Sequence, residues 1–255
     1  MESSASPSQE PIPGEASEPV LEARGLVREF GPIRAVDGVG FSLGAGELMT
    51  VFGPNGAGKT TLLKVLAGAL KPTEGSVRLR DRELRTGDPD WNRRIGVLSH
   101  QSFLYGHLTL EENLRFYGKL FGLLDLGDRI PERLAQVGLE KRAGSLARTL
   151  SRGMRQRLAL ARTLLHDPEF VLLDEPYTGL DAHAAAVLRG VLTSLKDGRR
   201  TVILVTHNLS QGLELADRVA IQVRGRFVHL GPRDSLDLRS FEHFYREKVE
   251  KEEAR

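Results

Sequence analysis

The octapeptide GPNGAGKT at residues 53–60 has the pattern G-x-x-x-x-G-K-[ST], and no other feature constrains the fold of this chain as strongly. An apolar stretch precedes it at residues 48–52, and a run typical of a helix follows at residues 61–67. A strand before the loop and a helix after it are what this motif requires. Glycines let successive backbone N–H groups turn toward phosphate oxygens, because a Cβ would block the approach, and the helix N-terminus adds partial positive charge. The sequence therefore predicts a loop that holds the phosphates of a nucleoside triphosphate.

Two side chains of this loop have specific expected roles. Lys59 can reach the β- and γ-phosphates, and the Thr60 hydroxyl can ligate Mg²⁺. The nucleotide-binding residues predicted here are Gly53, Pro54, Asn55, Gly56, Ala57, Gly58, Lys59, Thr60 and Thr61. The alternative is a glycine-rich turn beside an incidental lysine, and it fits poorly because every fixed position and both flanks match the motif.

Composition limits the class of protein. The chain has 255 residues, a formal net charge of +2 and no cysteine. This length allows one large domain or two small ones, and the balanced charge gives no field that would attract nucleic acid. The lack of cysteine excludes disulfides and thiolate metal sites. The sequence contains neither an apolar run long enough to span a membrane nor a signal-peptide core, so we expect a soluble intracellular protein.

The order of apolar runs predicts an α/β layout. Residues 1–19 are rich in Ser, Pro and Glu, which is typical of a disordered tail. Seven short runs predict strands, at residues 21–27, 34–42, 47–52, 75–79, 170–173, 201–205 and 218–223. The first three are separated by glycines and predict antiparallel strands that lead into the first parallel strand. The last three are almost continuously apolar, as in parallel strands buried on both faces.

A helical insertion is predicted between about residues 103 and 160. Thr109 and Glu112 have the spacing of a capping box that opens a helix through Leu120. A second short helix is predicted from Pro131 to Val137. A main domain is therefore expected over residues 20–236, followed at residues 237–255 by one charged helix rather than a further domain.

Two adjacent carboxylates, Asp174 and Glu175, follow the apolar run at residues 170–173. The C-terminal ends of parallel strands are where open α/β sheets bind ligands. Neighbouring residues of a strand point to opposite sides, so the two acids are expected to differ in role. Asp174 suits the coordination of Mg²⁺, and Glu175 suits a base that polarises the attacking water. A strand ending in two acids is often only structural, and the phosphate loop earlier in the chain favours the catalytic interpretation.

His207 follows the apolar run at residues 201–205, which places an imidazole at the same sheet edge as the two acids. It can donate a hydrogen bond to a γ-phosphate oxygen and position Glu175 or the water. A lone histidine after a strand is more often solvated, and only the neighbouring acids favour a catalytic role. The other histidines show no metal-ligand spacing.

Residues 150–157, LSRGMRQR, resemble the LSGGQ signature of ABC transporter ATPase subunits. Other family elements occur in order: Gln101 matches the Q-loop, Asp181 ends the D-loop sequence TGLD, and Phe30 occupies the place of the aromatic that stacks on adenine. His207 matches the switch histidine. The resemblance, over residues 20–230, implies an α/β fold of the P-loop NTPase (ABC ATPase) type, with a RecA-like parallel-sheet core, an antiparallel β subdomain and a helical subdomain.

The same resemblance implies a head-to-tail dimer, homodimeric or formed with a related cassette, that closes on two ATP molecules with Mg²⁺. One subunit would supply the phosphate loop, Asp174, Glu175, His207 and Gln101, which adds to the shell of Mg²⁺ and water. The other would offer Ser151 and Gly153 to the same γ-phosphate, and Asp181 is predicted to belong to the same nucleotide-binding set. A helix N-terminus with a serine hydroxyl is chemically suited to bind an anion.

Three residues depart from the common family pattern. Arg152 replaces a glycine of the signature, and we expect it to face solvent, although it could add charge near the nucleotide. Met154 replaces glutamine and cannot make its hydrogen bonds. Phe30 replaces a frequent tyrosine, which preserves stacking and removes only a hydroxyl.

The segment at residues 108–122 resembles compact bacterial exporter subunits, nearest to the haem-exporter ATPase of cytochrome c maturation and then to drug- or lipid-export ATPases. This implies an integral membrane permease as partner and a location on the cytoplasmic face of the inner membrane, with no nucleic acid bound. Phe103, Leu104 and Tyr105 are then expected to be partly exposed, as a docking site for the permease. The alternatives are an importer ATPase, a soluble non-transport ATPase, a metabolite kinase and a nucleotide-binding module without turnover.

Overall fold

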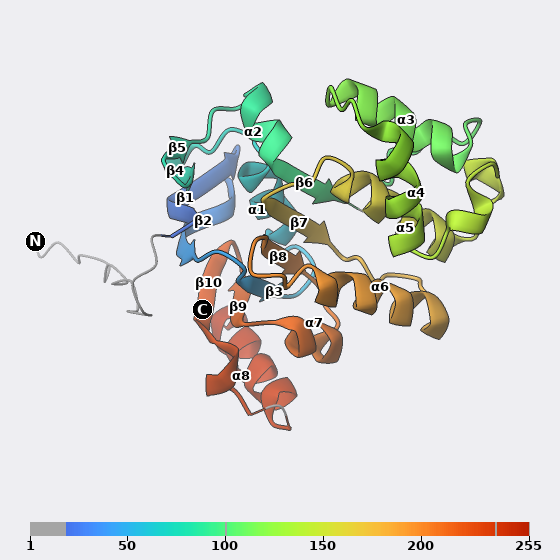
Figure 1. Ribbon diagram of the computed structural model, residues 1–255. Coiled ribbons are helices and arrows are strands. Elements are labelled where there is room, and N and C mark those ends of the chain that lie inside the picture. Colours follow the sequence, from blue (N-terminus) through green and yellow to red (C-terminus); the bar gives the residue numbers. More distant parts are fainter. Residues whose placement is uncertain (1–18, 100, 238, 255) are drawn as a thin grey trace, which may run out of the picture.

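The computed structural model describes residues 19–99, 101–237 and 239–254, and the described chain forms two β-sheets with helices around them (Figure 1). The strands are β1 (Leu21–Phe30), β2 (Ile33–Leu43), β3 (Leu48–Phe52), β4 (Glu74–Leu79), β5 (Arg82–Glu83), β6 (Ile95–Leu98), β7 (Phe170–Asp174), β8 (Thr201–Val205), β9 (Arg218–Val223) and β10 (Arg226–Pro232). The helices are α1 (Lys59–Leu66), α2 (Pro89–Arg94), α3 (Leu110–Leu120), α4 (Leu126–Gln136), α5 (Arg152–Leu164), α6 (Ala182–Ser194), α7 (Leu209–Leu215) and α8 (Phe241–Glu253). The tail predicted over residues 1–19 lies outside the described residues, apart from Pro19.

The larger sheet has the strand order β10-β9-β3-β8-β7-β6, in which only β10 is antiparallel to its neighbour. The smaller sheet, β2-β1-β4-β5, is antiparallel throughout. A parallel core beside an antiparallel sheet confirms the predicted fold class. Because β3, β8 and β7 are adjacent and parallel, the loops that follow them meet at one edge of the sheet.

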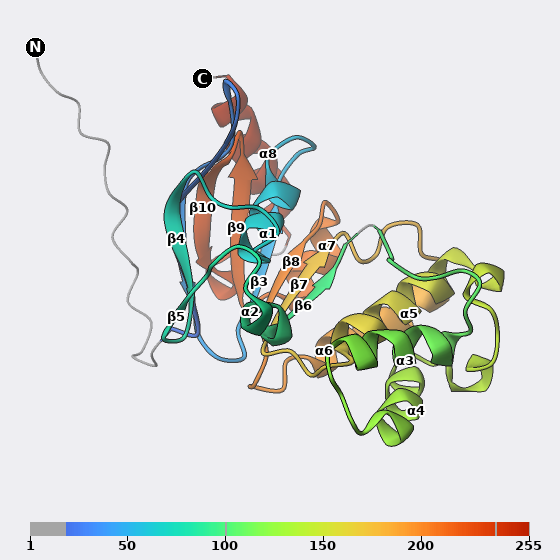
Figure 2. The ribbon, with the colours of Figure 1, turned by 90° about the horizontal axis from the view of Figure 1, so that it is seen from above.

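The central strands are buried on both faces, as their continuous apolar runs predict. In β7, Phe170 and Leu172 pack in the cluster that contains α1 and the antiparallel sheet, whereas Val171 and Leu173 pack against the helices on the other side. Helix α1 lies between the two sheets (Figure 2). The phosphate-loop motif therefore sits at the start of a helix that is enclosed by sheet on two sides.

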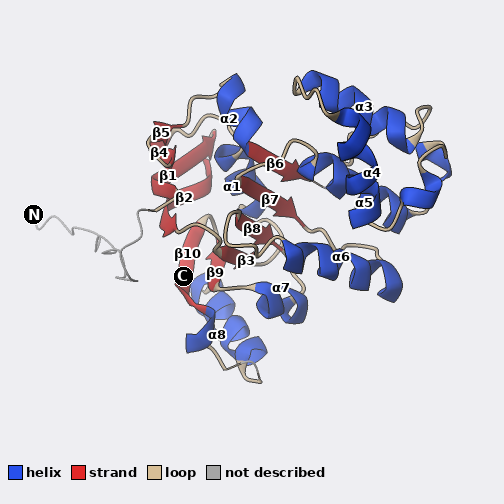
Figure 3. Ribbon diagram, in the orientation of Figure 1, coloured by secondary structure: helices blue, strands red, loops and turns tan. Residues whose placement is uncertain are grey.

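Helices α3, α4 and α5 gather on the side away from the antiparallel sheet (Figure 3). The predicted capping box is confirmed at α3: the Thr109 hydroxyl accepts from the Glu112 N–H at 3.1 Å, and Glu112 accepts from the Thr109 N–H at 2.8 Å. No helix within the described ranges combines the length and apolar character that crossing a bilayer requires.

The helix predicted from Pro131 to Val137 is wrong at its start, because α4 begins at Leu126 and Pro131 lies inside it. A proline in a helix interior removes one hydrogen bond, so the first turn was its expected place. Leu126, Ile130 and Leu134 lie four residues apart, and all three are buried. Burial of this apolar stripe outweighs the loss of one backbone hydrogen bond.

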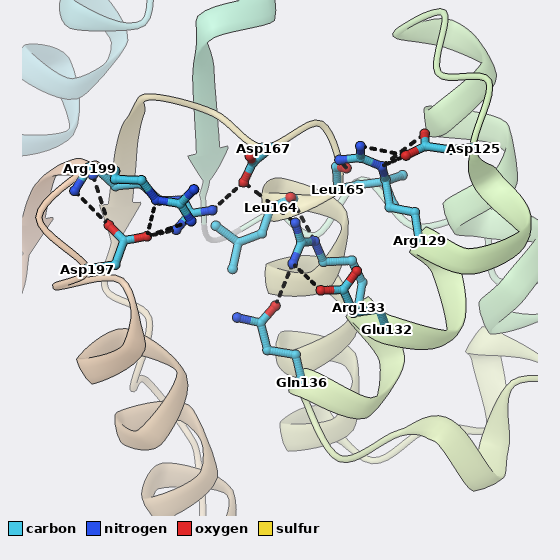
Figure 4. Close-up of polar contacts among 11 residues, drawn as sticks. Asp125, Arg129, Glu132, Arg133, Gln136, Leu164, Leu165, Asp167, Asp197 and Arg199 are labelled. Carbon is cyan, nitrogen blue, oxygen red and sulfur yellow. Dashed lines mark hydrogen bonds and ion pairs between the residues drawn. The ribbon is translucent and has the colours of Figure 1, made fainter.

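Two arginines of α4 bind the C-terminal end of α5 (Figure 4). Arg129 Nη1 donates to the Leu165 carbonyl at 3.2 Å, and Arg133 Nε donates to the Leu164 carbonyl at 3.1 Å. Arg133 also lies 3.6 Å from Asp167, in the turn that leads to β7. The last carbonyls of a helix have no partner within the helix, so these guanidinium groups satisfy them and fix the position of α5.

Some elements were not predicted although the sequence carries signals for them. Helix α2 begins with Asp88 as its N-cap and Pro89 at its first position, a combination that favours a helix start. Strand β6 is a four-residue apolar run, too short to recognise by periodicity. The predicted C-terminal helix is confirmed as α8, which ends at Glu253.

Candidate functional site

The candidate site is built from the loops after β3, β7 and β8, which lie side by side in the sheet. They carry the motif at residues 53–60, the acids Asp174 and Glu175, and His207. The structure thus brings to one sheet edge three segments that are far apart in the sequence. This is the edge at which parallel α/β sheets bind ligands.

The backbone of the loop is tightly packed at two glycines and open at a third. A Cβ on Gly58, whose φ is +99°, would lie 1.9 Å from the Ala35 carbonyl oxygen, and one on Gly53 would lie 2.2 Å from the Gln222 carbonyl oxygen. A Cβ on Gly56 would meet no atom within 4 Å. The loop therefore has no room for side chains where it meets the protein and leaves space at Gly56, a shape that fits phosphate oxygens close to the backbone.

Lys59 is buried, and its side chain folds back onto the start of the phosphate loop. Its Nζ donates to the Gly53 carbonyl at 2.8 Å and to the Pro54 carbonyl at 2.9 Å. Burial lowers the pKa of Lys59, and the negative charges of Glu175 and Asp174 act in the opposite direction. The structure thus places the ammonium group beside the loop with two carboxylates nearby.

Thr60 and Asp174 are in direct contact, although 114 positions separate them. Thr60 Oγ1 donates to Asp174 Oδ2 at 3.0 Å, and Asp174 is 5% exposed. A hydroxyl and a carboxylate at this separation are the hard oxygen donors that Mg²⁺ prefers. The donor set therefore fits the metal predicted for it.

Glu175 is held by two donors on a single oxygen. His207 Nδ1 lies 2.8 Å from Glu175 Oε2, and the Thr206 hydroxyl donates to the same oxygen at 3.2 Å. The strand-alternation argument for the two acids does not apply as stated, because β7 ends at Asp174 and Glu175 has φ +49°. This left-handed backbone, rare for a residue with a side chain, turns Glu175 toward β8 rather than toward Thr60.

Within the described residues, no hydrogen bond joins Gln101 or Phe30 to the phosphate loop, the two acids or His207. Gln101 is exposed after β6, and its carbonyl accepts from the Ser99 hydroxyl at 2.9 Å. Phe30 is 45% exposed, and the guanidinium of Arg28 lies 4.6 Å from its ring centroid. One face of the ring is therefore occupied by a cation, so a base would stack on the other face or displace Arg28.

Ser151, Gly153 and Asp181 lie together at the starts of α5 and α6. The Ser151 hydroxyl accepts from the Met154 N–H at 3.3 Å, and Asp181 Oδ1 accepts from the Ala184 N–H at 2.7 Å. A Cβ on Gly153 would lie 2.8 Å from the Ala184 Cβ, so the two helix starts are in close contact. Within the described residues, no hydrogen bond or ion pair joins them to the phosphate loop of the same chain.

Arg152 is exposed, as expected, but it also lies against the loop before α6. Its Cζ is 2.4 Å from the ideal Cβ position of Gly179, so the guanidinium covers this glycine. The Met154 side chain packs against the helical core cluster, and its backbone N–H, not its side chain, bonds to the Ser151 cap. Loss of a glutamine at this position therefore leaves the cap of α5 in place.

Three residues that support the loop were missed by sequence reasoning: Ala35, Gln222 and Gly225. Ala35 and Gln222 contact Gly58 and Gly53 through their backbone carbonyls, and the Gly225 N–H donates to the Ala57 carbonyl at 2.9 Å. Backbone contacts leave no side-chain signature in a sequence. Only Gly225 had a signal, as a glycine in a short turn between two apolar runs.

The chain is similar to known proteins both in a family model and in individual sequences. Residues 36–178 match a family model described as ABC transporter. The chain is 36% identical over 225 residues to the Nod factor export ATP-binding protein I of Ralstonia nicotianae, which covers 88% of this chain and 70% of that protein. It is 39% identical over 213 residues to a fluoroquinolones export ATP-binding protein of Mycobacterium tuberculosis, covering 83% of this chain and 70% of that protein.

A third relative is the spermidine/putrescine import ATP-binding protein PotA of Pseudomonas aeruginosa, 35% identical over 221 residues. The match covers 86% of this chain but 61% of the importer protein, so the chain spans less than two thirds of that relative. A solved structure of the ATP-binding subunit of an ABC transporter superposes with a TM-score of 0.78 at 28% identity, covering 89% of this chain and 94% of that one. These relatives include both export and import proteins, so they do not support a haem-exporter ATPase as the nearest relative.

Proposed function

This chain belongs to the ABC transporter family, whose ATP-binding subunits hydrolyse ATP, and on that premise we propose that it is the ATPase subunit of a membrane exporter. The observation that carries the proposal is the convergence of two pairs, Thr60 with Asp174 and Glu175 with His207, at one sheet edge. One pair suits the metal of a nucleotide and the other suits the activation of water. Export is favoured because two export proteins match this chain at 36% and 39% identity, against 35% for the polyamine importer.

The phosphate loop is proposed to hold the nucleotide through its backbone. The open side of Gly56 would receive phosphate oxygens, and Lys59 would exchange its two loop carbonyls for the β- and γ-phosphates. Thr60 and Asp174 would hold Mg²⁺ as an oxygen-liganded ion, with Gln101 joining them from the loop after β6. When bound, the ion supplies charge neutralisation on the phosphates.

Glu175 and His207 are proposed to act on the attacking water. Both hydrogen bonds from the protein go to Oε2 of Glu175, which fixes the carboxylate so that Oε1 can accept a proton from water. His207 donates from Nδ1, because an ionised carboxylate only accepts. Its Nε2 can then donate to a phosphate oxygen only when the ring is doubly protonated.

A second cassette is proposed to complete the site. Ser151 and Gly153 lie at the N-terminus of α5, and Ser151 is exposed; within the described residues, neither has a hydrogen bond or ion pair with the phosphate loop of its own chain. Their helix start, with no acidic residue in its first turn, suits an anion on another subunit. ATP would then join two cassettes, which separate after hydrolysis.

The permease is proposed to dock on aromatic side chains beside α3. Phe103 is 55% exposed, Tyr105 40% and Phe116 42%, and the Tyr105 and Phe116 rings meet edge to face with centroids 5.0 Å apart. Exposed aromatics grouped in this way are typical of protein interfaces. The docking site predicted at Phe103–Tyr105 thus extends onto α3, and the chain would lie at the cytoplasmic face of the membrane. A haem-type cargo remains a prediction that rests on sequence resemblance.

Size-exclusion chromatography with Mg-ATP tests this proposal. Wild type, Glu175→Gln and Lys59→Ala are compared with and without ATP. Removing the base should trap an ATP-bound dimer in Glu175→Gln, and the same change combined with Lys59→Ala should abolish that dimer. A Glu175→Gln protein that binds ATP and remains a monomer would contradict the closure of two cassettes by ATP alone.

A further inference from the structure

One side of the phosphate loop rests on the turn between β9 and β10. The Gly225 N–H in this turn donates to the Ala57 carbonyl at 2.9 Å, and the Gly225 carbonyl accepts from the Asp37 N–H at 3.0 Å. A Cβ on Gly225, where φ is +83°, would lie 2.9 Å from the Arg34 carbonyl oxygen. The turn is therefore held against β2 and in turn holds the backbone between Gly56 and Gly58.

Arg224, the residue before Gly225, joins this turn to the end of α8. Its Nη2 donates to the Glu253 carbonyl at 2.8 Å. Glu253 is the last residue of α8, and terminal carbonyls of a helix have no partner within the helix. The guanidinium therefore caps α8 and at the same time ties the turn to it.

The first residue of α8 contacts the strand that enters the loop. Phe241 is 2% exposed, and its ring centroid lies 5.3 Å from that of Phe52, the residue directly before Gly53. Both rings belong to an apolar cluster that includes Leu213 of α7 and Ile221 of β9. In Figure 1, α8 lies beside β9 and β10 with α7 next to it. The first residue of α8 thus contacts the residue directly before the phosphate loop, and its last residue is joined to the turn that holds Ala57 by way of Arg224.

We propose that α8 is a positioning element for the phosphate-binding loop and that it sets the affinity for ATP. The inference rests on the proposed role of residues 53–60 in binding the phosphates. A loop binds phosphate only in the conformation that turns its N–H groups inward, and the measured dissociation constant rises as the population of that conformation falls. Phe241 and Arg224 restrict the loop from both of its ends. Among the described residues, no hydrogen bond, ion pair or ring contact joins Phe241 or Arg224 to Glu175 or His207, so the loss of either should change binding and leave the chemical step unaltered.

Two substitutions in the full chain test the proposal. Arg224→Met keeps the length of the side chain and removes the donor, and Phe241→Leu keeps an apolar group and removes the ring. Each should raise the Kd for Mg-ATP about three- to tenfold, the scale of one hydrogen bond or ring contact, and leave kcat at saturating ATP within about twofold of wild type. Arg224→Lys retains a donor and should keep an affinity close to that of wild type.

The matched control is Arg246→Met on the exposed side of α8, whose guanidinium has Glu242, 2.6 Å away on the same helix, as its one ion-pair partner in the described part of the chain. It should leave the Kd unchanged. If Arg224→Met and Phe241→Leu lower Tm but bind ATP as wild type does well below Tm, α8 has only a structural role and the inference is wrong. Lys59→Ala distinguishes failure of the proposed loop function from failure of the inference about α8. If Lys59→Ala also binds ATP normally, residues 53–60 do not bind the phosphates. If Lys59→Ala alone loses ATP binding, only the inference about α8 is contradicted.

Discussion

His207 Nδ1 lies 2.8 Å from Glu175 Oε2, and this contact joins the two neighbouring strands β7 and β8 at their C-terminal ends. The Glu175 N–H also donates to the Val205 carbonyl at 2.8 Å, so the backbone of the acid is bound to the strand that carries the histidine. Because both contacts come from β8, the position of the carboxylate follows the position of that strand's end. The two residues are therefore expected to act as one unit rather than as independent groups.

His207→Ala should retain ATP binding and lower the rate of ATP hydrolysis by about 10²-fold or more, the scale of a general acid–base contribution. The loss arises because Glu175 keeps only the longer hydrogen bond from Thr206, at 3.2 Å. Phosphate release under saturating ATP measures the rate. The double variant Glu175→Gln, His207→Ala should be no slower than the slower single variant, since members of one unit are not additive. Additive losses would mean that the two residues act separately.

Alanine substitutions at Gly56 and Gly38 distinguish an effect on ATP binding from the cost of backbone strain. Gly56 in the loop has φ +80° and Gly38 in β2 has φ +67°, and a Cβ on either would meet no atom within 4 Å. Gly56→Ala and Gly38→Ala should each lower the free energy of unfolding by about 1–2 kcal/mol, the cost of a left-handed backbone for alanine. Only Gly56→Ala should weaken ATP binding, because its methyl group occupies the open side of the loop. Equal ATP affinities, measured by calorimetry, would place the phosphates elsewhere.

Two fully buried amides should respond in opposite ways to replacement by leucine. Gln222 makes one long hydrogen bond, 3.5 Å from Nε2 to the Gly225 carbonyl, and its Oε1 has no hydrogen-bond partner within the described chain. The Gly225 carbonyl keeps the Asp37 N–H as donor if Gln222 is replaced. Gln222→Leu should therefore raise the free energy of unfolding by about 1 kcal/mol, because an unpaired polar group leaves the core.

Asn113 serves as the comparison for Gln222, because it is equally buried and its amide is fully hydrogen-bonded. Its Oδ1 accepts from the Tyr105 N–H at 2.8 Å, and its Nδ2 donates to the carbonyls of Tyr105, Leu108 and Thr109. Asn113→Leu should lower the free energy of unfolding by about 3 kcal/mol, since several buried backbone groups lose their partner. Denaturant unfolding measures both variants. A loss of stability in Gln222→Leu similar to that in Asn113→Leu would show that the Gln222 amide is satisfied in solution.

The segments that carry the site motifs were predictable from the sequence, because the function of each motif requires particular residue types at fixed positions after a strand. Strands β3, β7 and β8 are short and mostly apolar, and each ends at or directly before the polar residues of its motif. Strands buried on both faces are mostly apolar, so a switch to polar residues indicates where such a strand ends. The predicted capping box at Thr109 was equally local and is confirmed.

Contacts between distant backbone atoms could not be predicted in this way. Nothing in the sequence shows that the Gln222 carbonyl lies against Gly53 or that Gly225 holds Ala57. The start of α4 was missed because local rules for Pro131 favour a helix beginning at that residue, whereas tertiary burial of Leu126 and Ile130 decides the outcome. The assigned roles of Ser151 and Gln101 remain predictions.

Burial of His166 should make the stability of this protein depend on pH. Burial lowers the pKa of His166 from its ordinary value of 6.5 to about 4, with the nearby charges of Arg162 and Arg129 adding to the shift. The ring stacks on Phe121 with centroids 4.0 Å apart, and its Nε2 bonds to the Ile95 carbonyl at 3.0 Å. The neutral ring is therefore the form that fits the folded state.

Between pH 6.5 and about 4 the unfolded chain binds a proton at His166 that the folded chain does not. The free energy of unfolding should thus fall as pH falls through this window, and this group should contribute no further change above or below it. From pH 7 to pH 5 the loss due to His166 should be ~2 kcal/mol. His166→Gln can still donate to the Ile95 carbonyl and does not titrate, so its stability should fall by that much less over the same range. Equal slopes in urea unfolding of the two proteins would mean that His166 is protonated in the folded state at pH 5.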